Sequence, residues 1–343
     1  MGKKRQGYFW RDWDFERILD LRICDLNLKL GRCPINQVFQ SVCKELRDKE
    51  IVFVPHVWLS DEFFCPDGIP GIAIPFYLAH PKLIQLEKKM MLEAEGSNRR
   101  EATRILRHEM GHSIEHAYFL NRKKQRIVTF GKTTLKYPES YVPKPFSKSY
   151  VLNLENWYAQ SHPDEDFAET FAVWLNPHSH WKSRYAKWPA IKKLNCINVL
   201  MKEIQGRRPL NRSKTKVDPV ERIKKTLREY YEEKRERYGL DMPATFYDRD
   251  LRRVFSDSDE HRKMKFAHRF IRKHRRDIRK SVSFWTGQYQ YAVDQVIEEL
   301  ETRCRELELK LMFDESKTLS DLMMMVAVHA MNHRYEGGYQ IVL

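Results

Sequence analysis

The sequence predicts an α+β protein that is mainly helical, with a small edge-stranded sheet in its N-terminal half and a basic, all-helical C-terminal part. Three observations predict this class. Apolar residues recur at helical spacing over most of the 343 residues. Two short segments have the character of strands instead: 51–59, which is rich in Val and aromatic residues, and 71–78. Beyond Gly206 the composition becomes strongly basic while the helical spacing continues.

In the N-terminal part, glycine and proline residues that break the apolar pattern indicate where the predicted helices and strands end. Residues 10–49 have apolar residues at helical spacing and are broken at Gly31 and Pro34, which predicts two helices. The two strand-like segments each contain a proline, which lacks a ladder N–H, so each strand is expected at an edge or at a bulge. An edge strand can hold an extended peptide through main-chain hydrogen bonds. We assign this substrate-binding role to Gly71, Ile72, Ala73 and Ile74.

The middle of the chain predicts two longer helices. Asn98 followed by Glu101 has capping-box spacing, and no proline interrupts the segment up to residue 120, so one long helix is expected there. Residues 121–156 are polar and contain three prolines, which is typical of an irregular segment. Pro163 is then expected to begin a second helix that ends near Leu175.

The charge distribution divides the chain. Residues 206–280 carry 25 Lys and Arg against 13 Asp and Glu, so this segment holds most of the net charge of +15. We therefore predict two domains, 1–205 and a basic helical domain at 206–343. A surplus of cations favours acidic partners, such as nucleic acid, an anionic surface or an acidic polypeptide.

The densest basic stretch is His261 to Lys280, where apolar residues also recur at helical spacing. Such a helix can follow the phosphates of a nucleic acid. A charge run is more often a solvated helix face, so nucleic-acid binding is the less favoured interpretation and docking of an acidic protein substrate is at least as well supported.

The cysteines and the N-terminal residues bear on the cellular compartment of the protein. The six cysteines form no C-x-x-C pair and no dense pattern, as expected for reduced thiols in the cytoplasm. The first 22 residues lack the apolar run of a signal peptide, and no segment has the length of a membrane span. We expect a cytoplasmic protein without a membrane partner.

A metal-binding motif lies within the long predicted helix. His108-Glu109-Met110-Gly111-His112 places two histidines just over one helical turn apart, so both imidazoles leave one face and can reach one zinc ion. Glu109 lies near the same side, where its carboxylate can take a proton from water that zinc acidifies. The motif also occurs by chance in helices, so a third ligand is needed.

The second helix offers a candidate for that third ligand. Glu165 and Glu169 are four residues apart and share one face, which suits Glu165 on zinc and Glu169 accepting a ring N–H from a ligand histidine. The opposite face carries Phe167, Phe171 and Trp174. The alternative is an amphipathic helix with a solvated acidic stripe. His116, one turn beyond the second histidine of the motif, is expected outside the ligand set because a straight helix carries it away.

The two segments together resemble a known group of zinc proteins. H-E-x-G-H followed by E-x-F-A-E-x-F-A is similar to the gluzincins of the anthrax lethal factor and Pro-Pro endopeptidase group. The form H-P-x-E-D-x-A-E-T resembles a family of bacterial proteins described as zinc-binding metallopeptidases. The resemblance covers roughly residues 70–180. It implies a zincin-like catalytic domain, a zinc cofactor and hydrolysis of a protein or peptide substrate.

The resemblance also implies roles for single residues. Glu165 corresponds to the third metal ligand, and Glu169 to a residue that supports the ligands without binding the metal. Tyr158, seven residues before Glu165, corresponds to a phenol that assists the transition state. A phenol there can donate to the developing oxyanion. Simple packing beside Trp157 explains Tyr158 equally well. A second function also stays open: a non-catalytic zinc-containing protein that binds nucleic acid or an acidic partner through its basic domain.

Overall fold

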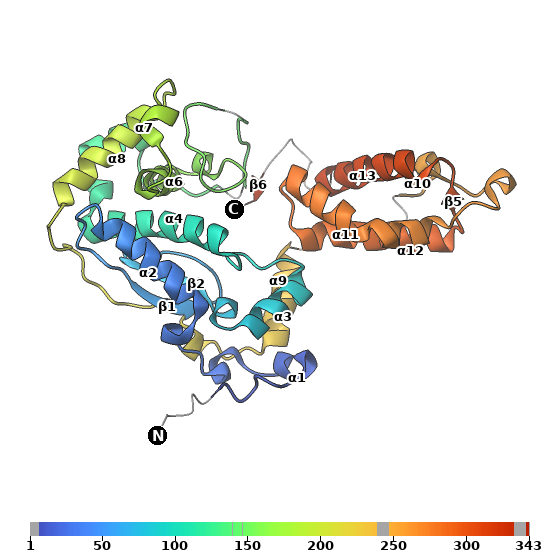
Figure 1. Cartoon of the computed structure of the whole chain (residues 1–343), viewed down its shortest axis with the longest axis horizontal. Coiled ribbons are helices and arrows are strands. Elements are labelled where there is room, and N and C mark those ends of the chain that lie inside the picture. The colour runs from blue at the N-terminus through green and yellow to red at the C-terminus, as the bar shows by residue number, and fades with distance from the viewer. Residues whose placement is uncertain (1–6, 139, 146, 239–246, 333–340, 343) are drawn as a thin grey trace. The chain divides into compact units, whose positions relative to one another are not determined.

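The computed structural model describes residues 7–138, 140–145, 147–238, 247–332 and 341–342 (Figure 1). These residues form two compact units that divide between Glu229 and Tyr230, except that residues 91–93 belong to the second unit and 341–342 to the first. The chain is mainly helical with a small two-stranded sheet, as predicted. The domain boundary between residues 205 and 206 stays a prediction.

Helices make up most of the first unit. None of the helices within the described residues is both long and apolar enough to cross a membrane. The single-turn 3₁₀ helices η1 to η6 are Ile23–Leu26, Leu30–Arg32, Phe76–Ala79, Leu120–Arg122, Tyr158–Gln160 and Val220–Arg222. The α-helices up to residue 204 are α1 (Phe15–Leu19), α2 (Pro34–Arg47), α3 (Pro81–Met91), α4 (Arg99–Tyr118), α5 (Lys124–Phe130), α6 (Pro163–Leu175), α7 (Trp181–Arg184) and α8 (Ile191–Ile204).

The sheet differs in detail from the prediction. Strands β1 (His56–Ser60) and β2 (Gly71–Pro75) pair in parallel, and both are shorter than the predicted segments. The residues after β2 turn into η3, because Pro75 ends the ladder it cannot donate to. On the side of β2 away from β1, the amide of Ala73 donates to the carbonyl of Phe64 at 2.8 Å. β2 is therefore covered on both sides at Ala73, and all five of its residues are buried.

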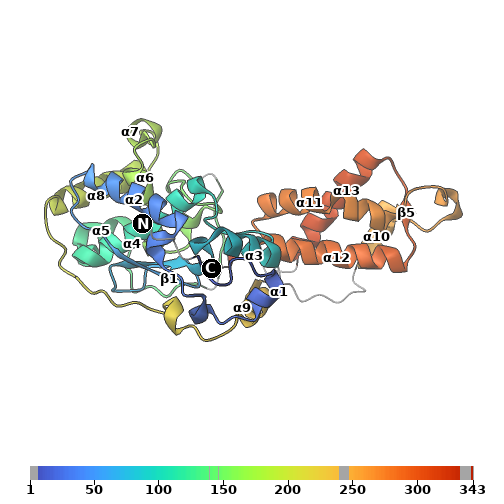
Figure 2. The same ribbon diagram turned by 60° about the horizontal axis from the view of Figure 1, so that its bottom comes forward.

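The long helix α4 forms the centre of the first unit. It packs against α2 and against α6, and α6 packs in turn against α8 (Figures 1 and 2). The predicted start is confirmed, because the side chain of Asn98 accepts the amide of Glu101. The helix ends where Phe119 adopts a left-handed conformation with φ of 52°. Its burial over most of its length makes it a rigid base for side chains.

The segment between the two long helices is more ordered than predicted. Residues 121–156 were expected to be irregular, but they contain α5 and the two-residue strand β3 (Ser140–Tyr141), which pairs with β6 (Ile341–Val342). Helix α5 forms because it buries two side chains, Arg126 and Phe130, in the unit. A seven-residue helix is too short to give a clear periodicity, which explains why the pattern did not predict it.

The second unit is a helical cluster with its own apolar core. That core contains Phe270, Ile271 and Ile278 from the predicted basic helix, packed against residues of its neighbours. Two short strands, β4 (Phe255–Ser256) and β5 (Lys310–Leu311), pair antiparallel at its edge. The single-turn 3₁₀ helix η8 is Asp259–His261, and the α-helices are α9 (Leu227–Tyr238, which starts in the first unit), α10 (Asp248–Val254), α11 (Ala267–Thr286), α12 (Gln290–Glu306) and α13 (Glu315–Asn332).

Much of the basic charge of α11 is used inside this unit. Arg275 donates to both carboxylate oxygens of Asp294 at 2.9 and 2.6 Å. Arg272 pairs with Glu301 at 2.6 Å, and Arg279 also contacts Asp294. These three cations therefore tie α11 to α12. The charge density of the stretch is in part a structural feature of helix packing.

Candidate metal centre

Helix α4 places the three residues of the sequence motif in the interior. The side chains of His108 and His112 are 3% and 12% exposed, so both imidazoles are withdrawn from solvent. Glu109 lies between them in sequence and is also buried. Because the residues lie on a single helix that is held on both sides, their relative positions are fixed by the backbone.

Glu165 from α6 meets the two histidines at one point. Its Oε2 atom lies 3.0 Å from Nε2 of His108 and 3.3 Å from Nε2 of His112, and the two Nε2 atoms are 3.1 Å apart. Ligand atoms at about 2.0–2.1 Å from a tetrahedral zinc ion are separated by about 3.3 Å. The three atoms thus fit one zinc ion, and His108, His112 and Glu165 form a group that can hold a metal.

Glu169 fixes the ring of the first histidine. Its Oε1 atom lies 2.9 Å from Nδ1 of His108, and a carboxylate only accepts, so Nδ1 carries the proton. The lone pair of Nε2 is then free to face the group. Glu169 is itself held by the side-chain amide of Asn153 and the backbone amide of Leu154, both at 2.7 Å. These hydrogen bonds fix the tautomer of His108 in which Nε2 can bind zinc.

Glu165 and the histidines of the group shift the pKa values of one another. Burial alone lowers the pKa of His112, but the Glu165 carboxylate outweighs burial and raises that pKa. Burial alone raises the pKa of Glu165, yet the two histidines hold it well below its ordinary value. The carboxylate therefore stays negative beside the two nitrogens.

Glu109 differs from the other acids of the site. Its Oε2 atom is buried and has no hydrogen-bond partner among the described residues. Burial raises the pKa of Glu109, although the neighbouring histidines partly oppose this. A buried carboxylate oxygen without a partner is energetically costly, and buried acids with a raised pKa are enriched at functional sites.

A glycine lets the two helices come together. A Cβ atom on Gly111 would lie 2.9 Å from the Cα of Ala168 and 3.2 Å from its carbonyl oxygen. Both atoms belong to the backbone of α6 and cannot move aside. Gly111 is therefore the residue that allows α4 and α6 to approach closely enough for Glu165 to reach the histidines.

Tyr158 lies beside the first histidine. Its ring centroid is 5.6 Å from that of His108, and the two ring planes are tilted by 55°. The two residues before it, Asn156 and Trp157, have positive φ values of 56° and 52°. A left-handed conformation costs a bulky residue about 1–2 kcal/mol, so the turn that presents Tyr158 is strained.

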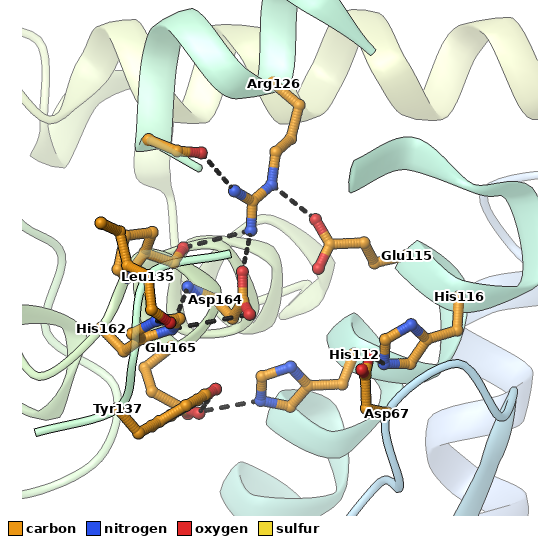
Figure 3. A network of polar contacts seen from close by, with 12 residues as sticks. Asp67, His112, Glu115, His116, Arg126, Leu135, Tyr137, His162, Asp164 and Glu165 are labelled. Carbon is orange, nitrogen blue, oxygen red and sulfur yellow. Dashed lines mark hydrogen bonds and ion pairs between the residues drawn. The ribbon is translucent and has the colours of Figure 1, made fainter. Parts of the chain in front are cut away.

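A buried arginine ties three segments together next to the site (Figure 3). Arg126 from α5 is fully buried and donates to Glu115 of α4 at 2.6 Å and to Asp164 of α6 at 2.5 Å. A third donor of the guanidinium contacts the carbonyl of Gly131 at 2.6 Å. Arg126 thus anchors the start of α6 one residue before Glu165. Sequence reasoning missed it, because one arginine in a polar segment has no distinguishing pattern.

Tyr137 was also missed. Its hydroxyl donates to Oε1 of Glu165 at 2.9 Å, and its ring stacks on His162 with centroids 3.8 Å apart (Figure 3). Tyr137 belongs to the segment 131–138, which has neither helical nor strand periodicity. A signal for its role is therefore absent from the sequence.

The remaining predicted residues fall outside the metal group. His116 is not part of it, as predicted, and its Nε2 atom lies 4.0 Å from Asp67 instead. The residues Gly71, Ile72, Ala73 and Ile74 are buried in β2, with Phe64 paired to Ala73 on the outer side. Ala73 therefore does not present the open edge that the sequence suggested, and the substrate-binding role of this strand stays a prediction.

Residues 87–198 match the model of a family described as "Putative zinc-binding metallo-peptidase". The matched region contains α4, α6 and the whole metal group. Neither the curated proteins nor the solved structures gave a match to this chain. The zinc predicted from the sequence therefore agrees with the family description and with a His-His-Glu group that can bind a metal.

Proposed function

We propose that this chain is a zinc-dependent metallopeptidase of the gluzincin type, which hydrolyses peptide bonds with Glu109 as general base. The observation that carries the proposal is the convergence of His108, His112 and Glu165 beside Glu109, whose buried Oε2 atom has no hydrogen-bond partner among the described residues. A closed structural zinc site needs no such carboxylate, because four protein ligands complete its coordination.

Each residue of the site has a distinct role in the proposed hydrolysis. When bound by the His-His-Glu group, zinc supplies Lewis-acid chemistry that acidifies water and polarises a carbonyl. Glu109 takes up the water proton at Oε2, which is free to accept it. The hydroxyl of Tyr158 donates a hydrogen bond to the oxygen on which negative charge develops. Glu169 holds His108 in the required tautomer throughout.

The proposed substrate is a protein or peptide, with acidic character favoured by the net charge of +15. The second function, a non-catalytic zinc protein that binds nucleic acid or an acidic partner through the basic domain, has less support. Arg272, Arg275 and Arg279 are already engaged by acids of α12. Part of the basic charge of α11 is therefore used in helix packing, whereas the His-His-Glu group and Glu109 support the enzyme directly.

The experiment is a peptide-library hydrolysis assay with zinc-loaded protein and its Glu109→Gln variant. Because Gln cannot accept the proton, the variant should lose at least about a hundredfold in rate while it keeps its zinc. Equal rates in the two proteins would refute the proposed base. Loss of zinc together with activity would assign Glu109 a structural role instead.

A further inference from the structure

The two oxygens of the Glu165 carboxylate have different neighbours. Oε2 faces the nitrogens of His108 and His112. Oε1 accepts a hydrogen bond from the hydroxyl of Tyr137 at 2.9 Å. Figure 3 shows Tyr137 and His112 on either side of the Glu165 carboxylate. An oxygen that already accepts a hydrogen bond is a weaker metal ligand than one that accepts none, so the Tyr137 hydroxyl favours metal binding through Oε2.

Tyr137 is itself held by His162, the residue that caps α6. The imidazole ring stacks on the phenol ring with an interplanar angle of 19°. Nδ1 of His162 accepts the amide of Asp164 at 3.2 Å, so Nε2 carries the proton and donates to the carbonyl of Leu135 at 3.0 Å. One side chain therefore caps the helix, anchors the segment and packs the tyrosine.

The same segment is fixed at its beginning. The guanidinium of Arg126 donates to the carbonyl of Gly131, and it also binds Asp164. Segment 131–137 is thus tied to the first turn of α6 by Arg126 at one end and by His162 near the other. Tyr137 has a defined place although its side chain is half exposed.

We propose that Tyr137 is a positioning residue that holds Glu165 as a one-oxygen ligand, and that His162 keeps Tyr137 in place. The inference rests on the proposed function, since it assigns a residue to the same metal group. Hydrogen-bonding partners of metal ligands typically change metal affinity by about 10–100-fold. Tyr137 and His162 act through Glu165 and need no contact with substrate.

The test measures zinc affinity by competition with a chromogenic chelator, which needs no substrate. Tyr137→Phe removes only the hydroxyl from a half-exposed side chain and should weaken zinc binding about tenfold. Tyr118→Phe is the matched control, because it removes a phenol hydrogen bond of 2.8 Å, to the carbonyl of Arg207, from a residue of α4 outside the metal group. The control should bind zinc like the original protein.

A second variant tests the link through His162. His162→Asn keeps an acceptor for the cap but removes the stacked ring and the contact with Leu135. It should weaken zinc binding by a similar factor, and the double variant should be no weaker than either single one, since both act through one hydrogen bond. Multiplied effects in the double variant would overturn the link.

The results distinguish failure of the positioning role of Tyr137 from failure of the proposed function. If the unmodified protein binds zinc and Tyr137→Phe binds it equally tightly, the positioning role is wrong while the proposed function stands. If Tyr137→Phe lowers only the unfolding temperature of the metal-free protein, its role is structural and the inference is likewise wrong. If the unmodified protein binds no zinc, the proposed function itself fails.

Discussion

Oε2 of Glu165 lies 3.3 Å from Nε2 of His112, although 53 residues separate the two in the chain. The distance depends on how closely α6 approaches α4. Gly111 and Ala168 set that approach at the crossing point. The metal group is therefore a property of the packing of two helices as much as of the motif itself.

Gly111→Ala should disrupt this packing. The added methyl group meets the backbone of Ala168 at 2.9 Å, so the helices must separate. We expect a loss of about 1–3 kcal/mol in the free energy of unfolding, together with weaker zinc binding. Denaturant titration and chelator competition measure the two effects. Gly31→Ala, at a position with nothing nearby, is the control. Unchanged zinc affinity in Gly111→Ala would contradict this account of the crossing.

Arg126→Met should be among the most destabilising single changes. It leaves Glu115 and Asp164 without their buried partner, and removal of one member of a buried ion pair costs about 3–5 kcal/mol. Lys44→Met is the control, because its pair with Asp48 is largely exposed and contributes less than about 1 kcal/mol. Unfolding in denaturant compares them. A loss in Arg126→Met no larger than in the control would disprove the anchoring role.

Stability should fall in acid partly through His116. Burial lowers the pKa of His116 to about 4, below its ordinary value of 6.5. Between these values the unfolded chain binds a proton that the folded chain does not, so stability decreases as the pH falls through this window. Between pH 7 and pH 4.5, the free energy of unfolding should fall by about 2–3 kcal/mol less in His116→Gln than in the unmodified protein. His178→Gln, at an exposed position, is the control. Identical pH dependence of unfolding in His116→Gln and the original protein would argue against the shift.

Tyr158→Phe should separate catalysis from metal binding. If the hydroxyl stabilises the oxyanion, its loss lowers kcat by about 100-fold and leaves zinc content and KM nearly unchanged. The ring remains to pack beside His108, so the fold is kept. Kinetics with a cleavable peptide measure the effect. A fully active variant would leave Tyr158 with the packing role alone.

The two long helices and the pair of histidines on α4 were predictable because their signals are local, whereas Glu165 was predicted from a second motif on α6. Asn98 and Pro163 mark the starts of α4 and α6, and four-residue spacing places His108 with His112 on one face. Tyr137 and Arg126 were not predictable. Their roles arise from tertiary contacts with Glu165 and Asp164, which no periodicity records.

The basic helix and the sheet show the same limit. The cationic residues of 261–280 predicted a charged face, but the acids that neutralise Arg272 and Arg275 lie on another helix. Likewise, the composition of β2 predicted a strand, while its cover by Phe64 depends on how the connecting loop folds back. Sequence patterns predict helices and strands, but the residues that each helix or strand contacts are decided by tertiary packing.

We expect His108, His112 and Glu165 to bind one zinc ion together. The most direct measurement is the zinc content of the purified protein and of Glu165→Ala, each loaded with zinc, dialysed and subjected to elemental analysis. We expect about one zinc ion per chain in the original protein and little or none in the variant. Equal zinc in the two proteins, or no zinc in either, would contradict it.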